Sequence, residues 1–146
     1  MGEHNLPLDL QSRSNASLTY VFFAFLVSLT ATLGSLFFSE IMNFIPCSLC
    51  WYQRIFMYSL VFLFLTNLLF PDDKIFKYSI SLAVFGWIIS IYHNLLMFGI
   101  IPEKLSPCVQ GVPCSTQYIN WLGFINIPLL SFFVYSFILI FLLNIK

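Results

Sequence analysis

The sequence predicts an all-α integral membrane protein folded as a four-helix bundle. It is 60% hydrophobic and only 8% charged, whereas an ordinary soluble domain carries about 25% charged residues. A soluble domain of this length has too little interior to bury so much apolar surface. The apolar residues gather in long stretches, and four cysteines lie in pairs between them. The formal net charge is zero, so nothing in the charge indicates nucleic-acid binding.

Each apolar stretch is close to the roughly 20 residues that a helix needs to cross a bilayer. The stretches run from about Leu18 to Phe38, Cys50 to Phe70, Tyr78 to Ile101 and Trp121 to Leu143. The first is too long for the apolar part of a cleavable signal peptide, and a polar tail precedes it. We therefore expect residues 1–17 to form a mobile cytoplasmic tail and residues 18–146 to form a single transmembrane domain.

The distribution of basic residues predicts the orientation. An even number of spans places both termini on one side, which also holds the link 71–77. That side carries Arg13, Lys74, Lys77 and Lys146, and the other side carries Arg54 and Lys104. Because basic residues favour the cytoplasmic side, both termini are expected there, and the cysteine loops are expected outside.

All four cysteines fall on the non-cytoplasmic side. Cys47 and Cys50 lie where the second span begins, and Cys108 and Cys114 lie between the third and fourth spans. An oxidising compartment permits disulfides there, whereas the cytosol generally does not. Each pair could be a structural staple or a redox centre.

The first pair lies in the segment PCSLCWYQR, residues 46–54. Two cysteines separated by two residues close too short a loop to be a good staple, but the spacing is typical of redox pairs. Pro46 suits the first position of a helix, which would place Cys47, Cys50 and Arg54 on one face. Arg54, about 6 Å along the axis from Cys50, could then stabilise a Cys50 thiolate. Alternatively, its guanidinium extends to the lipid headgroups.

His93 is the other strongly ionisable residue within the spans. If the third helix ends at Ile101, His93 lies about 12 Å below that end, at a depth that Arg54 could share. Ionisable groups inside a membrane usually mark a functional site. The alternative is a histidine that forms a hydrogen bond across a helix interface.

The sequence also restricts the electron acceptor. It contains no glycine-rich nucleotide loop, and Trp51 follows Cys50 where a haem-attachment motif would need histidine. The acceptor must therefore come from the lipid or from outside. A quinone is lipid-soluble and takes two electrons, and Arg54 and His93 could contact its ring oxygens.

The second pair lies in PCVQGVPC, residues 107–114. Pro107, Gly111 and Pro113 predict a turn that can bring the two sulfurs together. Because the segment is polar, we expect it to be exposed and open to a protein partner. A loop staple is the alternative.

These residues resemble the DsbB/BdbC disulfide-bond formation proteins, a family of four-helix membrane quinone reductases. The resemblance rests on CSLCWYQR at the start of the second span, on His93 in SIYHNL (90–95), on the paired loop cysteines, and on WLGFINIP (121–128). The short spacing in PCVQGVPC is similar to that of the compact-loop, Gram-positive-type branch.

The resemblance implies an electron relay. A thioredoxin-like dithiol oxidase of the DsbA/BdbD type would attack Cys108, and Cys114 would exchange with the first pair at Cys47. The freed Cys50 thiolate would then face the quinone, helped by Arg54. The resemblance thus implies a protein-dithiol:quinone oxidoreductase with menaquinone or ubiquinone as cofactor and no metal. We expect a multi-pass monomer in the bacterial cell membrane.

Three other interpretations fit parts of the sequence. Vitamin K epoxide reductase-like enzymes share the helical bundle, cysteine pairs and quinone, but their loop pair precedes the Cys-x-x-Cys pair. A metal-binding membrane protein could use the four cysteines as zinc ligands. A non-enzymatic four-span protein could hold two disulfide staples, although Arg54 and His93 would then need separate explanations.

Overall fold

The computed structural model describes residues 8–105, 108, 113–114 and 126–145, with only the backbone described for residues 8–14. The described residues contain no strand. The helices are α1 (Leu8–Glu40), α2 (Ser48–Leu69), α3 (Asp73–Met97) and α4 (Ile127–Asn144), with a short 3₁₀ helix, η1 (Glu103–Leu105), after α3. Each of the four α-helices contains a segment long and apolar enough to cross a membrane. The predicted all-α four-helix membrane bundle is confirmed.

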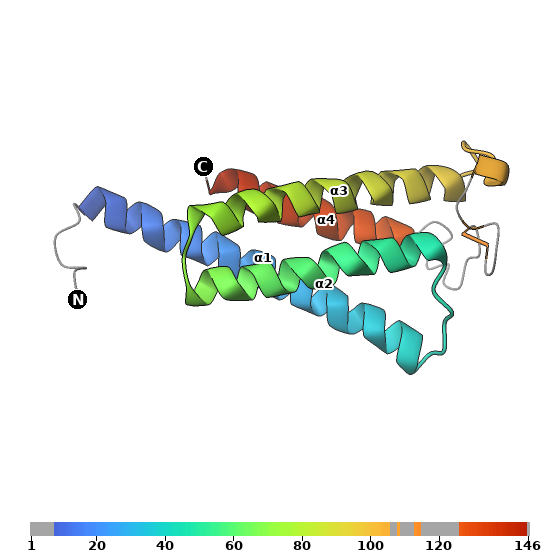
Figure 1. Cartoon of the computed structure of the whole chain (residues 1–146), viewed down its shortest axis with the longest axis horizontal. Helices are drawn as coiled ribbons and strands as arrows, with labels where there is room; N and C mark the ends of the chain where they lie inside the picture. The colour runs from blue at the N-terminus through green and yellow to red at the C-terminus, as the bar shows by residue number, and fades with distance from the viewer. Residues whose placement is uncertain (1–7, 106–107, 109–112, 115–125, 146) are drawn as a thin grey trace.

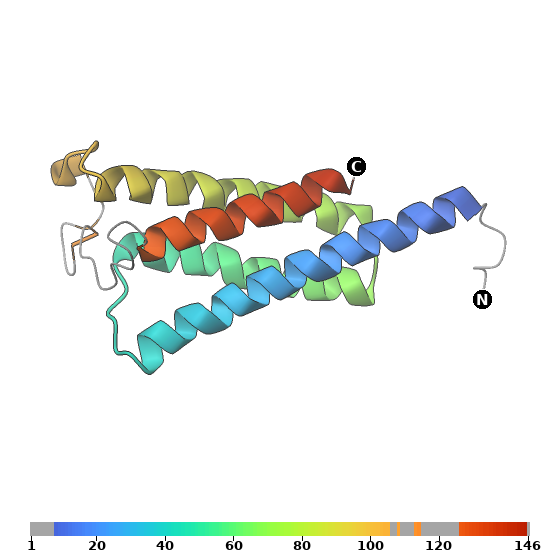
Figure 2. The ribbon, with the colours of Figure 1, turned by 180° about the vertical axis from the view of Figure 1, so that it is seen from behind.

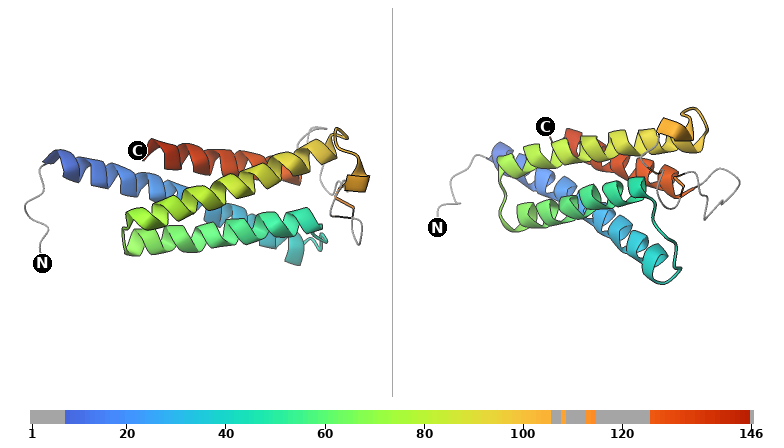
Figure 3. Two further views of the ribbon diagram at one scale, coloured as in Figure 1. Left: turned by 45° about the horizontal axis from the view of Figure 1, so that its top comes forward. Right: turned by 45° about the vertical axis from the view of Figure 1, so that its right-hand side comes forward.

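The helices form a closed ring in which α1 packs against α2, α2 against α3, α3 against α4, and α4 against α1. The beginning of α1, the α2–α3 link and the end of α4 lie at one end of the bundle (Figures 1 and 2). The α1–α2 connection, the end of α3 and the start of α4 lie at the other end, which we call the cysteine end. Near the cysteine end α1 diverges from α2, as Figure 1 and the right-hand view of Figure 3 show.

Two helix boundaries differ from the sequence prediction at the end of the bundle that holds the termini. Helix α1 begins at Leu8, upstream of the apolar stretch that starts at Leu18, because polar residues can continue a helix as readily as apolar ones. Most of the expected link 71–77 is helical. There the Asp72 carboxylate accepts a hydrogen bond from the backbone amide of Lys74 at 2.9 Å and caps α3.

Helix α3 also ends earlier than predicted, at Met97. Gly99 adopts φ 73° just beyond it, a left-handed conformation that commonly terminates helices. His93 therefore lies about 6 Å from the end of α3, nearer to the connecting loop than the sequence suggested.

The interior near the termini is apolar and closely packed. Its buried members include Val21, Ala24, Leu60, Phe64, Ala83, Ile138 and Leu142. Midway along the bundle, Gly86 of α3 meets the ring of Tyr135 from α4 so closely that a β-carbon at this position would collide with it. The Tyr135 hydroxyl donates a hydrogen bond to the backbone carbonyl of Gln53 at 2.7 Å. This bond joins α4 to α2 just below the cysteine end.

Candidate redox site

Cys47 is the N-cap of α2, and the helix begins at Ser48. The expectation that Pro46 occupies the first helical position is therefore wrong. The Cys47 sulfur accepts the backbone N–H of Cys50 at 3.4 Å, so it satisfies one of the amides that a helix leaves unpaired at its start. The two sulfurs are 2.9 Å apart, and both cysteines are free thiols.

The surroundings of Cys47 favour its thiolate. A hydrogen bond from the Cys50 thiol, a contact with His93 and the Cys50 amide together hold the pKa of Cys47 well below its usual range, although burial opposes them. The Nε2 atom of His93 lies 3.8 Å from the Cys47 sulfur. A thiol with a lowered pKa is a good leaving group in thiol–disulfide exchange, so Cys47 is suited to be released from a disulfide.

Cys108 and Cys114 form a disulfide, with their Cα atoms 5.7 Å apart. The predicted pairing in the second loop is therefore present in the structure. The expectation of exposure is wrong for the two cysteines, which are only 6% and 4% exposed. They pack with Cys47, Leu49 and Leu96 in a small cluster at the cysteine end, which covers them. Pro107 and Gly111, which predicted the turn, lie outside the described residues.

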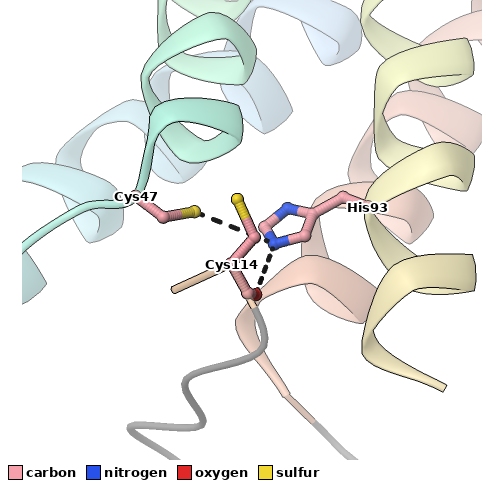
Figure 4. A group of neighbouring side chains, drawn as sticks. All are labelled: Cys47, His93 and Cys114. Carbon is pink, nitrogen blue, oxygen red and sulfur yellow. Dashed lines mark hydrogen bonds between the residues drawn. The ribbon is translucent and has the colours of Figure 1, made fainter. Parts of the chain in front are cut away.

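The two cysteine pairs meet at His93. The Cys47 sulfur, the Cys114 sulfur and a ring nitrogen of His93 all lie within 4.8 Å of one another. Figure 4 shows the imidazole reaching from α3 toward Cys114, with Cys47 facing them from the start of α2. Three segments that are distant in the sequence therefore place two sulfurs within reach of a small side-chain movement.

The hydrogen bonds of His93 define which ring nitrogen carries the proton. Its Nε2 atom lies 3.3 Å from the backbone oxygen of Cys114, which can only accept, so Nε2 is the donor. Its Nδ1 atom lies 3.3 Å from the side-chain nitrogen of Gln53, which can only donate, so Nδ1 is the acceptor. A neutral imidazole satisfies both bonds. The histidine, 1% exposed, thereby ties the second loop to α2 and α3.

Arg54 points toward α1. Its guanidinium donates a hydrogen bond to the backbone carbonyl of Ser35 at 3.0 Å, and its central carbon lies 5.8 Å from the centre of the Trp51 ring. The side chain is half-buried and bridges the two helices at the point where they diverge. It fixes a positive charge beside the first cysteine pair.

A cavity of about 310 Å³ lies between these groups and α1. Its polar side is lined by Cys47, Cys50, Gln53, Arg54 and His93. The remaining wall is largely apolar and includes Ala31, Gly34, Phe38, Met57, Leu130 and Val134. Small-molecule pockets usually have volumes of about 300–1,000 Å³ and combine apolar walls with a few polar groups. Arg54 and His93, which the sequence suggested could share a depth, both line this cavity.

Comparison with known proteins identifies the family. The family model described as "Disulfide bond formation protein DsbB" matches residues 17–145. The chain belongs to the DsbB family.

Similar proteins bear related names. Disulfide bond formation protein C of Bacillus subtilis is 46% identical over 129 residues, covering 88% of this chain and 94% of the relative. Probable disulfide formation protein C of Halalkalibacterium halodurans is 43% identical, covering 82% and 85% of the two chains. A probable disulfide formation protein of Metapseudomonas resinovorans is 35% identical, covering 83% and 85%. No solved structure matches the chain.

Family membership and the four apolar helices make this chain a multi-pass membrane protein and an oxidoreductase of disulfide bond formation. All six residues singled out from the sequence, namely Cys47, Cys50, Arg54, His93, Cys108 and Cys114, lie at the cysteine end. Most of the WLGFINIP segment, residues 121–125, lies outside the described residues. Its Asn126 is buried and precedes α4, and Pro128 lies in the first turn of that helix.

Sequence analysis missed Gln53 in this DsbB-family site. An uncharged polar residue inside an apolar span, next to Arg54 and one turn after Cys50, was a signal that could have identified it. Asn94 was likewise not predicted from the sequence; its side-chain nitrogen donates a hydrogen bond to the carbonyl of Pro128 at 2.9 Å. That bond holds the start of α4 against α3, next to His93.

Proposed function

We propose that this DsbB-family protein is a protein-dithiol:quinone oxidoreductase that reoxidises a thioredoxin-like partner outside the cytoplasm. The proposal rests on one observation above all, the proximity of the Cys114 and Cys47 sulfurs within 4.8 Å. Two structural staples would not need to adjoin each other, whereas a relay must bring its disulfides together. The match to the DsbB model over residues 17–145 favours this function over that of a vitamin K epoxide reductase-like enzyme.

The protein steps are successive thiol–disulfide exchanges. A partner thiolate attacks Cys108, which breaks the Cys108–Cys114 bond and leaves Cys114 as a thiolate. Cys114 attacks Cys47 of the oxidised first pair and releases the Cys50 thiolate. The partner's second thiol then closes the partner disulfide and frees Cys108.

Cys108 completes the protein steps by attacking Cys114. This attack restores the Cys108–Cys114 disulfide and releases Cys47, so the electron pair rests on Cys47 and Cys50. The described structure has this distribution, with the second pair bridged and the first pair free.

The cavity between α1 and α2 has the properties that a quinone site requires. Its wall is apolar, whereas Cys50 and the Arg54 guanidinium lie at its polar side. A bound menaquinone or ubiquinone would accept the two electrons and two protons that the first pair gives up. Arg54 would donate hydrogen bonds toward a ring oxygen, since an arginine cannot accept them. Cys50 lines the cavity directly and is the thiol proposed to deliver the electrons.

His93 supports the relay by position. Its Nε2–H donates to the Cys114 carbonyl while the same edge of the ring faces the Cys47 sulfur. It therefore holds the attacking and the attacked residue together, while its Nδ1 atom faces the Gln53 amide. His93 and Arg54 were both predicted to contact the quinone. In this proposal Arg54 keeps the predicted contact with the quinone. His93 lines the cavity and also positions Cys114 and Cys47 for the exchange between them.

We further propose that the cysteine end faces the outside of a bacterial cell membrane and that residues 1–17 are cytoplasmic. The proposal follows from the excess of lysine and arginine at the end that holds the termini. A membrane-impermeant thiol reagent should label reduced cysteines on intact cells. Labelling that requires cell lysis would reverse the orientation.

The direct test of function uses the purified full chain in detergent with a reduced thioredoxin-like dithiol and a soluble quinone. We expect quinone reduction, followed optically, in proportion to the dithiol oxidised. Replacing Cys47 by serine should lower the rate to the uncatalysed background, because the exchange between the pairs loses its electrophilic sulfur. Cys114→Ser should accumulate a partner adduct at Cys108, since the resolving thiol is absent. Normal quinone reduction by either variant would refute the relay.

A further inference from the structure

We propose that reduction of the Cys108–Cys114 disulfide creates a binding site for one Zn²⁺ ion, with Cys47, His93 and Cys114 as ligands. The three potential ligand atoms lie within 4.8 Å of one another, and all three residues are buried. They come from the start of α2, from α3 and from the second loop, so the folded bundle assembles the site. This binding goes beyond electron transfer and does not depend on it.

The distances are close to those of a tetrahedral zinc site. With bonds of about 2.3 Å to sulfur and 2.0–2.1 Å to nitrogen, two ligand atoms on one zinc ion lie about 3.5–3.8 Å apart. The Cys47 sulfur and the His93 Nε2 atom are already 3.8 Å apart. The Cys114 sulfur needs to approach by about 1 Å at most, which a side-chain rotation can supply once its disulfide is open.

Cys50 is a candidate for the fourth ligand, and its sulfur would have to move away from that of Cys47 by about 1 Å or less to reach the spacing of a tetrahedral site. Its sulfur lies 2.9 Å from that of Cys47, and three cysteines with one histidine form a common structural zinc set. Thiolate and imidazole ligands favour zinc over magnesium or calcium, which prefer oxygen. The chemistry of the cluster therefore selects a thiophilic ion.

Gln53 provides the partner that a zinc-binding histidine requires. For Nε2 to bind the ion, the ring proton must lie on Nδ1, 3.3 Å from the Gln53 amide group. A half-turn of the amide places its oxygen, in place of its nitrogen, next to that proton. Metal-ligating histidines almost always donate their second N–H to such an acceptor. Buried Gln53 can thus satisfy either form of His93.

The redox state controls the site. While Cys114 is bonded to Cys108 its sulfur has no thiolate to offer, so the oxidised protein lacks one ligand. Reduction supplies the thiolate, and binding releases the thiol protons to solvent without any change in oxidation state. If the relay proposed above operates, Zn²⁺ would withdraw Cys47 and Cys114 from exchange and arrest the reduced enzyme reversibly.

The test measures metal binding by the full chain in detergent, after reduction and anaerobic removal of the reductant. Co²⁺ is the probe, because tetrahedral thiolate coordination gives it intense visible and near-ultraviolet absorption, and Zn²⁺ should displace it. We expect one ion per reduced chain and none in the oxidised chain. Gln53→Leu should weaken Co²⁺ binding by about 10- to 100-fold.

Two cysteine variants form a matched pair. Cys108→Ala leaves Cys114 permanently as a thiol and should bind Co²⁺ even when only the first pair is reduced. Cys114→Ala should lose the tetrahedral spectrum. His93→Ala and the polar variant His93→Gln should lose it as well, with retention of helical circular dichroism showing that each still folds.

Unchanged Co²⁺ spectra in the His93 variants, or equal loss of binding in Cys108→Ala and Cys114→Ala, would overturn the site. Equal binding by the oxidised chain would overturn its control by the disulfide. None of these measurements uses turnover, so a failed quinone assay and a failed metal site are distinguishable.

Discussion

The two ends of the bundle are built from the same four helices but bury different kinds of side chain. Toward the termini the interior consists largely of apolar groups such as Leu60, Phe64 and Leu142, with Asn67 and Ser79 as buried polar exceptions. At the cysteine end it contains the cysteine sulfurs, Gln53 and His93. Apolar side chains need only fill space, whereas each buried polar group needs a specific partner. The apolar end therefore depends on close packing, whereas the cysteine end depends on matched hydrogen-bond partners.

Two glycines allow this difference to be tested with the same type of substitution. Gly86 contacts the Tyr135 ring, whereas a β-carbon at Gly34 would meet no atom within 4 Å. Gly86→Val should lower the free energy of unfolding by about 1–3 kcal/mol, because overpacking forces α3 and α4 apart. Unfolding in mixed detergent micelles measures this, with Gly34→Val as the control. Equal destabilisation by both variants would show that the packing does not differ.

Gln53→Leu should separate exchange chemistry from folding at the cysteine end. The change leaves the Nδ1 atom of His93 without its donor, a loss of about 1–3 kcal/mol for a buried group. The hydrogen bond from Tyr135 uses the Gln53 backbone carbonyl and should persist. We expect exchange between the two cysteine pairs to slow by about tenfold, measured by rapid quenching and thiol trapping. Gln53→Asn, whose side-chain amide can still donate a hydrogen bond, should retain more of the rate.

Gly34→Leu should impair quinone use while leaving disulfide exchange unchanged. The added side chain would extend into the cavity that Gly34 lines. We expect the KM for quinone to rise by roughly fivefold, equivalent to about 1 kcal/mol, and the quinone-free exchange between the cysteine pairs to stay normal. Gly34→Ala, which adds one methyl group, should have little effect. An unchanged KM in Gly34→Leu would place the quinone outside this cavity.

The smallest expected effect is on the pH dependence with which the Cys47 thiol of the reduced protein reacts with an alkylating reagent. Because its pKa is lowered, Cys47 should react with iodoacetamide at about pH 6, where an ordinary thiol with a pKa near 8.5 is protonated. The lowered pKa also contributes stability that is complete above the unfolded-state pKa and is lost as the pH falls through the folded-state pKa. Mass spectrometry of the alkylated protein measures the reactivity.

Cys50→Ala provides the control for the pH experiment. The substitution removes the thiol hydrogen bond, the largest influence on Cys47, so the alkylation profile should move toward that of an ordinary thiol. A profile that does not move would assign the lowered pKa to His93 instead.

Much of the architecture was predictable because a bilayer imposes simple rules on a sequence. A helix satisfies its own backbone, so an uninterrupted apolar stretch is enough to predict a span. The cysteine pairs likewise followed from the local sequence: the first from the spacing of Cys47 and Cys50, and the second from the proline and glycine residues that predict a turn between Cys108 and Cys114. Helix ends were predicted less well. The caps at Asp72 and Cys47 are individual hydrogen bonds to backbone amides, and the hydropathy of the sequence does not reveal them.

The sequence by itself determined the four spans, the grouping of the cysteines at one end and the candidates Arg54 and His93. Three contacts became visible only in the folded protein: Cys114 lies next to Cys47, the Gln53 side chain pairs with His93, and Arg54 reaches the backbone of α1. The physical reason is that these contacts join separate segments, and their geometry depends on how α1 diverges from α2 and how α3 and α4 pack. Periodicity and composition describe one helix at a time, whereas a redox site requires several helices to place their atoms within a few ångströms of each other.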